Sequence, residues 1–133
     1  MRALIFHNIT TDANGRPLGM LDGYEHGHAL VPVAIFDVDG DYPLEQIYHL
    51  LNVGDDPQMM GGCPDERAVI YRQNRNRSLS VGDVVALKDG DEITWSMCAS
   101  IGWTTITPPR WLAAHASQHG TTAMDLPASW PLG

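Results

Sequence analysis

Residues 33–40 read VAIFDVDG, an apolar run of strand character that ends in an Asp-x-Asp-Gly turn. Residues 43–53 follow closely and read PLEQIYHLLNV. The apolar side chains of this second stretch recur at the spacing of one helical face, at Leu44, Ile47, Leu50 and Leu51. Pro43 suits the first turn of a helix, and Asp41 is a candidate N-cap residue. The sequence therefore predicts a strand over 29–38 that leads directly into a helix over 43–53.

Short strand-like segments make up most of the remaining chain. They are bounded by turn residues and lie at 2–9, 67–72, 83–88, 92–98 and 101–107. The turn Lys88-Asp89-Gly90-Asp91 predicts a hairpin. Residues 110–119 form a candidate short C-terminal helix, and residues 121–133 read as a loose tail. This order predicts an α+β fold, in which one main helix packs on a curled, mostly antiparallel sheet or small barrel.

The length of 133 residues suits a single domain over residues 1–133. No run approaches the ~18 apolar residues of a membrane helix, so no membrane contact is expected. The first segment, MRALIFHNITTD, turns polar too early for a signal peptide. With no export signal, the two cysteines, Cys63 and Cys98, are expected to be reduced thiols in the cytoplasm.

Charge is distributed unevenly along the chain, whose net charge is −8. Residues 1–66 hold 11 acidic and 2 basic side chains, whereas residues 67–133 hold 5 acidic and 6 basic ones. A net negative molecule is repelled by DNA and by anionic lipid at long range. A local basic patch in the second half could still bind a phosphate group, or it could pair with the acidic half. Whether the acidic half mimics DNA is left open by the sequence.

Asp37 and Asp39 match the nucleophile and the acid–base residue of the motif that marks haloacid-dehalogenase-type phosphatases. The match stops at Asp41, because that superfamily has threonine at this position. Lys88 and the acidic pair at 91–92 follow too closely for the crossover connections that a parallel sheet requires. We therefore interpret the motif as a strand end and a turn, and we expect no catalytic residue there.

Metal-binding patterns are incomplete in this sequence. The aspartates within 37–41 fit the first positions of a calcium-binding EF-hand loop, but Tyr42 replaces its glycine and Tyr48 its final glutamate. His115 and His119 have the i, i+4 spacing of zinc ligands, but no glutamate follows in the zinc-protease pattern. We expect surface histidines, no metal and no cofactor.

The most distinctive polar stretch is RQNRNRSLS at residues 72–80. Arginine offers a fork of donors suited to phosphate or carboxylate, and asparagine can bind a base edge. Trp103, on a predicted strand, could supply a stacking face. The candidate ligand- or partner-binding residues are therefore Arg72, Arg75, Asn76, Arg77 and Trp103. Asp83 is expected to hold its turn rather than to take part in binding.

Residues from about 44 to 107 resemble the YodL-like domains of bacterial mobile-element and phage polyvalent proteins. The matching features are the helix LEQIYHLLNVGDDP, the phrase RSLSVGDVVAL and the aromatic residue in IGWTTI. Residues 97–100 (MCAS) depart from the Tyr- and Asp-containing strand of that family, so no shared site is carried over to them. The resemblance implies an accessory domain that occurs beside antirestriction and plasmid-transfer modules and has no settled catalytic reaction.

We expect a small cytoplasmic binding or accessory domain of a mobile-element or phage type, with a protein partner and no catalytic reaction. One alternative is a nucleic-acid-binding module, or a nuclease, that uses the Arg72–Arg77 loop. The VGDVV turn followed by hairpins suggests this alternative through fold-level analogy to small PUA and ASCH barrels. A second alternative is a metal-dependent hydrolase.

Overall fold

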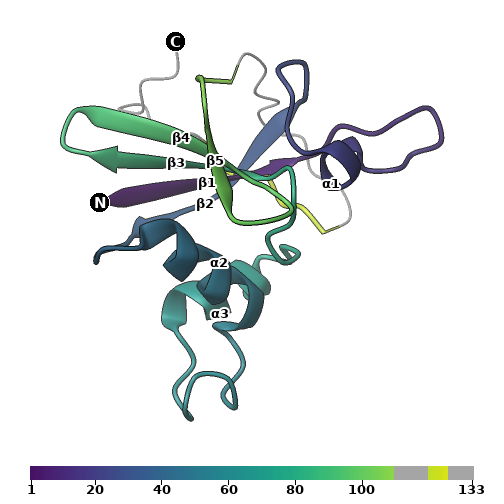
Figure 1. The fold of residues 1–133 in the computed structure, drawn as a ribbon. Coiled ribbons are helices and arrows are strands. Elements are labelled where there is room, and N and C mark those ends of the chain that lie inside the picture. The colour runs from purple at the N-terminus through teal and green to yellow at the C-terminus, as the bar shows by residue number, and fades with distance from the viewer. Residues whose placement is uncertain (110–119, 126–133) are drawn as a thin grey trace.

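The computed structural model describes residues 1–109 and 120–125, and Figure 1 shows how their elements are arranged. The described elements follow in the order β1 (Arg2–Asn8), α1 (Leu18–Asp22), β2 (Leu30–Asp37), α2 (Pro43–Val53), α3 (Glu66–Gln73), β3 (Val84–Asp89), β4 (Glu92–Cys98) and β5 (Trp103–Ile106). The predicted helix over 43–53 is confirmed. The strands predicted over 2–9 and 101–107 are also confirmed, with slightly shorter bounds. The predicted helix over 110–119 and most of the predicted tail lie outside the described residues.

The strands form one five-stranded sheet in the order β2-β1-β3-β4-β5, and every neighbouring pair is antiparallel. The fold is therefore α+β, as the sequence predicted. Asp89 pairs with Glu92 across the predicted two-residue hairpin turn, in which Gly90 has a positive φ of 64°. The sheet is open rather than closed into a barrel, so β2 and β5 are its edge strands.

Alternate residues of the strands build a separate core on each face of the sheet. On one face, Ile5, Val31 and Val85 pack with side chains of α2 and α3, which lie together below the sheet in Figure 1. On the other face, Phe6 packs on Trp95 with a distance of 5.5 Å between the ring centroids. Both faces of the sheet are covered. An added β strand would therefore pair with one of the edge strands, β2 or β5.

The prediction of a strand over 67–72 is wrong, because this segment lies within α3. Its run of consecutive apolar residues at 68–71 suggested a strand, but the residues around them favour a helix. Asp65 caps the helix by accepting the backbone N–H of Arg67 at 2.9 Å, and Arg72 lies in the last turn. Ala68 and Tyr71 are three residues apart and turn the same helical face toward the core.

One smaller expectation also differs from the structure. Asp41 is not the N-cap of α2, because Tyr42 occupies that position and makes no side-chain capping bond. Pro43 does occupy the first turn, as predicted. The first long loop contains the short helix α1, and a bridge between Thr11 and Pro17 closes the turn before it.

Candidate functional site

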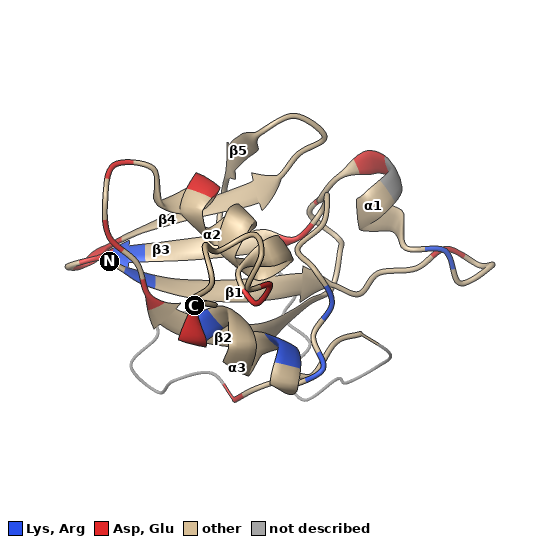
Figure 2. Cartoon of the chain, turned by 90° about the horizontal axis from the view of Figure 1, so that it is seen from below, with Lys and Arg blue, Asp and Glu red and all other residues tan. Residues whose placement is uncertain are grey.

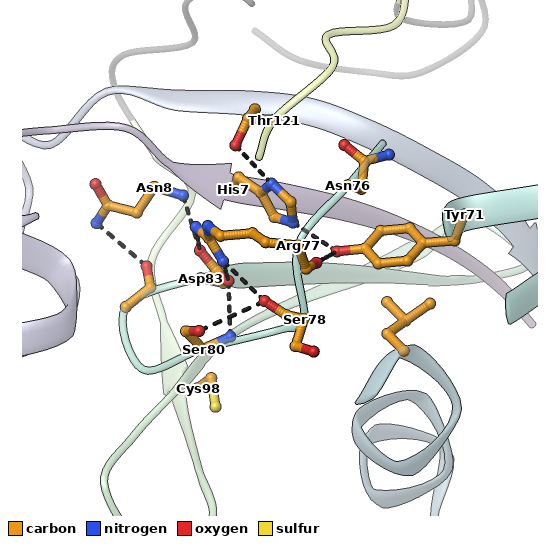
Figure 3. Close-up of polar contacts among 12 residues, drawn as sticks. His7, Asn8, Tyr71, Asn76, Arg77, Ser78, Ser80, Asp83, Cys98 and Thr121 are labelled. Atoms are coloured by element: carbon orange, nitrogen blue, oxygen red, sulfur yellow. Dashed lines mark hydrogen bonds and ion pairs between the residues drawn. The ribbon is translucent and has the colours of Figure 1, made fainter. Parts of the chain in front are cut away.

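An ion pair between a partly buried arginine and a buried aspartate joins the loop after α3 to the start of β3 (Figure 3). The guanidinium of Arg77 donates to both carboxylate oxygens of Asp83, at 2.7 and 2.8 Å. Asp83 is fully buried, and it also accepts the backbone N–H groups of Ser80 at 2.8 Å and Asn8 at 2.9 Å. Four donors therefore satisfy this buried carboxylate. The structure agrees with the expectation that Asp83 holds its turn. Asp83 also binds the side chain of Arg77 and the backbone at the end of β1.

Asn8 and Gly82 extend the same cluster toward α1. The Asn8 amide nitrogen lies 2.9 Å from Nδ1 of His28 and donates to the carbonyl of Gly82 at 3.2 Å. Gly82 has a positive φ of 92°, and a Cβ there would lie 2.5 Å from the backbone of Gly19. Only glycine fits this position, because the turn before β3 touches the backbone of α1 directly.

His7 is fully buried between Tyr71 and Thr121 (Figure 3). The Tyr71 hydroxyl donates its proton to the carbonyl of Arg77, so it can only accept from His7 Nε2, which lies 2.6 Å away. His7 therefore carries its proton on Nε2, and its Nδ1 accepts from the Thr121 hydroxyl at 2.9 Å. Burial lowers the pKa of His7 to about 4 and raises the pKa of Tyr71. Both side chains are neutral near pH 7, as a structural role requires.

The buried cluster also fastens residues 120–125 to the sheet. The carbonyl of Gly120 accepts the backbone N–H of Arg77 at 2.8 Å. Four residues later, the backbone N–H of Met124 donates to the carbonyl of Pro32 at 2.9 Å. This C-terminal segment thus runs from the loop after α3 to the outer edge of β2.

Arg72, one of the predicted binding residues, is bonded within the protein. Its guanidinium donates to the backbone carbonyls of Leu51 at 3.1 Å and Asn52 at 3.2 Å, and to the hydroxyl of Ser78 at 2.6 Å. A cation at a helix C-terminus is favourable, because the last carbonyls carry partial negative charge. Arg72 therefore fixes α3 against the end of α2.

Asn76 and Arg75 differ in exposure although they are adjacent. Asn76 is buried, and its side-chain oxygen accepts the backbone N–H of Thr122 at 2.9 Å, while its amide nitrogen has no hydrogen-bond partner among the described residues. Arg75 has an exposed side chain and a positive φ of 64°. In Figure 2 the basic segments of α3 and its following loop lie among tan and red ones rather than on a broad basic face. Of the three arginines in the predicted loop, Arg75 is the exposed one.

Trp103 lies on β5, apart from the arginine loop. It is half-buried, packs against the core cluster that includes Leu87 of β3, and lines a surface hollow together with Leu44 of α2. Arg72, Arg75 and Arg77 do not line this hollow. The structure therefore divides the predicted binding residues between an internal network, one exposed loop position and a separate aromatic surface.

A groove of about 310 Å³ lies between the edge strand β2 and helix α3. Most of its walls are apolar, and it is lined by Val33, Ala34, Ile35, Phe36, Arg67, Ile70, Tyr71, Asn74 and Met124. Ile70 is 49% exposed and forms part of the wall that α3 contributes to the groove. The groove is therefore an apolar surface bounded on one side by the open edge of a sheet.

Along β2, the backbone N–H and C=O groups of successive residues point alternately toward β1 and toward the outer edge beside the groove. Pro32 directs its carbonyl outward to Met124, and Asp37 directs its carbonyl outward to the Arg67 guanidinium at 2.7 Å. Ile35, two residues before Asp37, therefore presents its N–H and C=O on the same outer edge. No hydrogen bond to these two groups is made by residues 1–109 or 120–125. As far as residues 1–109 and 120–125 are concerned, this stretch of edge is open to an added strand.

Sequence reasoning missed both the internal network and the groove, although each left a signal. Pro32 lacks a backbone N–H, which suits an edge strand or a strand start, but the apolar run of Val33–Phe36 gave no sign of a groove beside it. Ile70 lies within the strand that the sequence predicted over 67–72, so its exposure on a helix was not expected. Once Asp65 is recognised as an N-cap, the helical spacing that turns Ala68 and Tyr71 inward leaves Ile70 on the outer side.

The described residues offer no metal centre and no membrane span. Within residues 1–109 and 120–125, no three His, Cys, Asp or Glu side chains gather closely enough to hold a metal ion. His115 and His119 lie outside these residues. Over the same described ranges, no helix is both long and apolar enough to cross a bilayer. Cys63 is exposed and Cys98 is buried, and both are free thiols.

Comparison with known proteins gives no relative from which a role could be transferred. No protein-family model, no curated protein and no solved structure matches the chain. The resemblance to YodL-like domains stays a prediction. Function must therefore be argued from the groove, the open edge and the charges of this chain itself.

Proposed function

We propose that this chain is a binding domain whose partner supplies an extended peptide segment, which lies along β2 and fills the groove against α3. The observation that carries the proposal is the open backbone of Ile35 next to an apolar groove. An extended peptide added to a sheet edge gains affinity from main-chain hydrogen bonds. Pockets beside the edge then select every second side chain of that peptide.

The chain's own C-terminal segment supports this mode of binding. Met124 already donates a backbone hydrogen bond to Pro32 on the same edge, and its side chain lines the groove. The edge of β2 thus accepts an extended segment at one point along its length. The partner segment would continue this pairing at Ile35, closer to the end of the strand.

The groove also indicates the chemistry of the partner. Its volume of about 310 Å³ is at the lower end of the range for ligand pockets, enough for one or two large side chains. Arg67 is already bonded to Asp65 at 2.8 Å and to the Asp37 carbonyl, so it has little capacity left for an anionic partner. We therefore expect an extended segment with large apolar residues at alternate positions.

Replacing Ile70 with lysine is expected to weaken binding of such a segment at least tenfold, because the ammonium group would stand in the apolar groove. Peptides would first be selected from a random library displayed on phage, and their synthetic versions would be titrated by fluorescence anisotropy. The expected selected sequences carry apolar residues two apart. Since Ile70 is 49% exposed, I70K should leave the fold intact, which thermal unfolding would check.

Tyr48→Lys is the matched control, because Tyr48 is 43% exposed on α2 and does not line the groove. Amide hydrogen exchange tests the pairing itself, and the N–H groups of Ile35 and Asp37 should exchange more slowly in the complex. Selected peptides with helical spacing, or equal affinity for I70K and the parent protein, would contradict the proposal. Sedimentation at increasing concentration would show whether a second copy of the chain occupies the edge instead.

Nucleic-acid binding is the alternative, and Arg75 is the residue with which to test it. Arg77 cannot serve, because removing it would leave Asp83 buried without its ionic partner. Labelled DNA and RNA would be titrated at ~50 and ~200 mM salt, where phosphate contacts weaken affinity steeply. Salt-sensitive binding that Arg75→Ala reduces would favour this alternative over peptide binding.

The biological setting of the proposed partner rests on the YodL-like resemblance alone. That resemblance suggests that the partner is a protein of a mobile element or phage. The metal-dependent hydrolase, the second alternative, has no site within the described residues and stays a prediction.

A further inference from the structure

A second hollow, with an aromatic wall and acidic rim, lies on the β5 side of α2. Its volume is about 330 Å³, and Leu44, Leu87 and Trp103 form its apolar part. Tyr42, at the start of α2, is 77% exposed and lines the same hollow. This surface therefore offers two aromatic side chains, one of them half-buried against the core and thus held in place.

The described charged residues that line this hollow all carry negative charge. Among the described residues that line it, Asp41 and Glu45 are the only ionisable ones besides Tyr42, and both are exposed. No lysine, arginine or histidine among residues 1–109 and 120–125 lines it. Neither carboxylate forms an ion pair with a described residue. The hollow is therefore complementary to a cation that also has an apolar or planar surface.

We propose that this hollow binds an arginine side chain of a protein partner, with the guanidinium stacked on Trp103 and bonded to Glu45 or Asp41. Guanidinium groups stack on indole faces and bond to carboxylates in the same plane, whereas an ammonium group is more strongly hydrated. The site is separate from the β2–α3 groove, shares no lining residue with it and does not depend on the proposed peptide binding.

The test compares two peptides that differ only in charge, acetyl-Gly-Gly-Arg-Gly-Gly-amide and the same peptide with citrulline. Each would be titrated into the ¹⁵N-labelled full chain, and the indole N–H signal of Trp103 would be followed by NMR. The arginine peptide is expected to shift this signal saturably, with a dissociation constant at least tenfold lower than that of the neutral citrulline peptide. Equal shifts for both peptides would overturn the proposal.

Variants then locate the interaction. Trp103→Leu should weaken binding of the arginine peptide about tenfold, followed on the amide signal of Leu44. Glu45→Gln should weaken it about two- to fivefold, whereas Glu25→Gln, an equal charge change at an exposed residue outside the hollow, should leave it unchanged. If both charge variants weaken binding equally, the attraction is non-specific and the proposal fails. Tetramethylammonium chloride binding more tightly than the arginine peptide would also overturn it, in favour of a small ammonium ligand.

Discussion

Replacing Asp83 with alanine is expected to lower the free energy of unfolding by about 3–5 kcal/mol, the usual cost of removing one partner from a buried ion pair. Asp83 is fully buried and accepts four hydrogen bonds, two of them from Arg77. Without the carboxylate, the guanidinium is left partly buried and uncompensated. The backbone N–H groups of Ser80 and Asn8 lose their acceptor as well.

Urea denaturation of the parent protein and of Asp83→Ala would measure this difference. Asp89→Ala is the matched control, because Asp89 is an exposed aspartate at the other end of β3, and its loss should change stability by less than about 0.5 kcal/mol. Arg77→Ala should also be strongly destabilising. If the two residues act as a pair, the double variant Arg77→Ala/Asp83→Ala should lose clearly less than the sum of the single losses. Additive losses would show that the pair is not coupled.

The fold could be predicted from this sequence where local patterns and tertiary contacts agree. The helix over 43–53 has an apolar face, and the hairpin at Gly90 has turn residues, so both follow from neighbouring residues. The segment 67–72 has apolar residues that fit either a strand or a short helix. Its state depends on the capping side chain of Asp65 and on packing against α2, and the second of these is not local.

The arginine loop shows why the candidate site was harder to predict. In sequence, a run of arginines and amides indicates a surface that binds anions. In the structure, Arg77 finds its carboxylate six residues later, and Arg72 finds carbonyls about twenty residues earlier. The exposure of a charged side chain depends on such distant partners. The edge position of β2 likewise follows from the strand order, which no local pattern specifies.

Lowering the pH from about 6.5 to about 4 is expected to cost this protein about 3 kcal/mol of stability through His7 alone. Burial lowers the pKa of His7 to about 4 from 6.5, and this effect exceeds that of nearby Asp83, which raises it. Between these two values the unfolded chain binds a proton that the folded chain does not. Protonation therefore favours unfolding in this window, and the loss is complete below pH 4, where both states are protonated.

The hydrogen bonds of His7 explain why the folded protein resists this proton. Nδ1 already accepts from the Thr121 hydroxyl, so a proton there would break the contact that fastens residues 120–125. The added charge would also be buried near Arg77, which lowers the pKa further. Acid should therefore loosen the C-terminal segment first, and Met124 would then release the edge of β2.

Denaturation curves from pH 4 to 7 would test this for the parent protein, His7→Gln and His49→Gln. The titration of carboxylates contributes to all three curves, so the expected signature is a difference in slope, with the His7→Gln curve flatter by about 3 kcal/mol over this range. His49 is exposed on α2 and lies outside the buried network, so His49→Gln controls for the loss of a histidine as such. NMR of the parent protein gives a check that needs no variant. The ¹⁵N shifts of His7 should show a proton on Nε2 at neutral pH, and a ring that titrates near pH 6.5 would show that His7 is not held in the buried network.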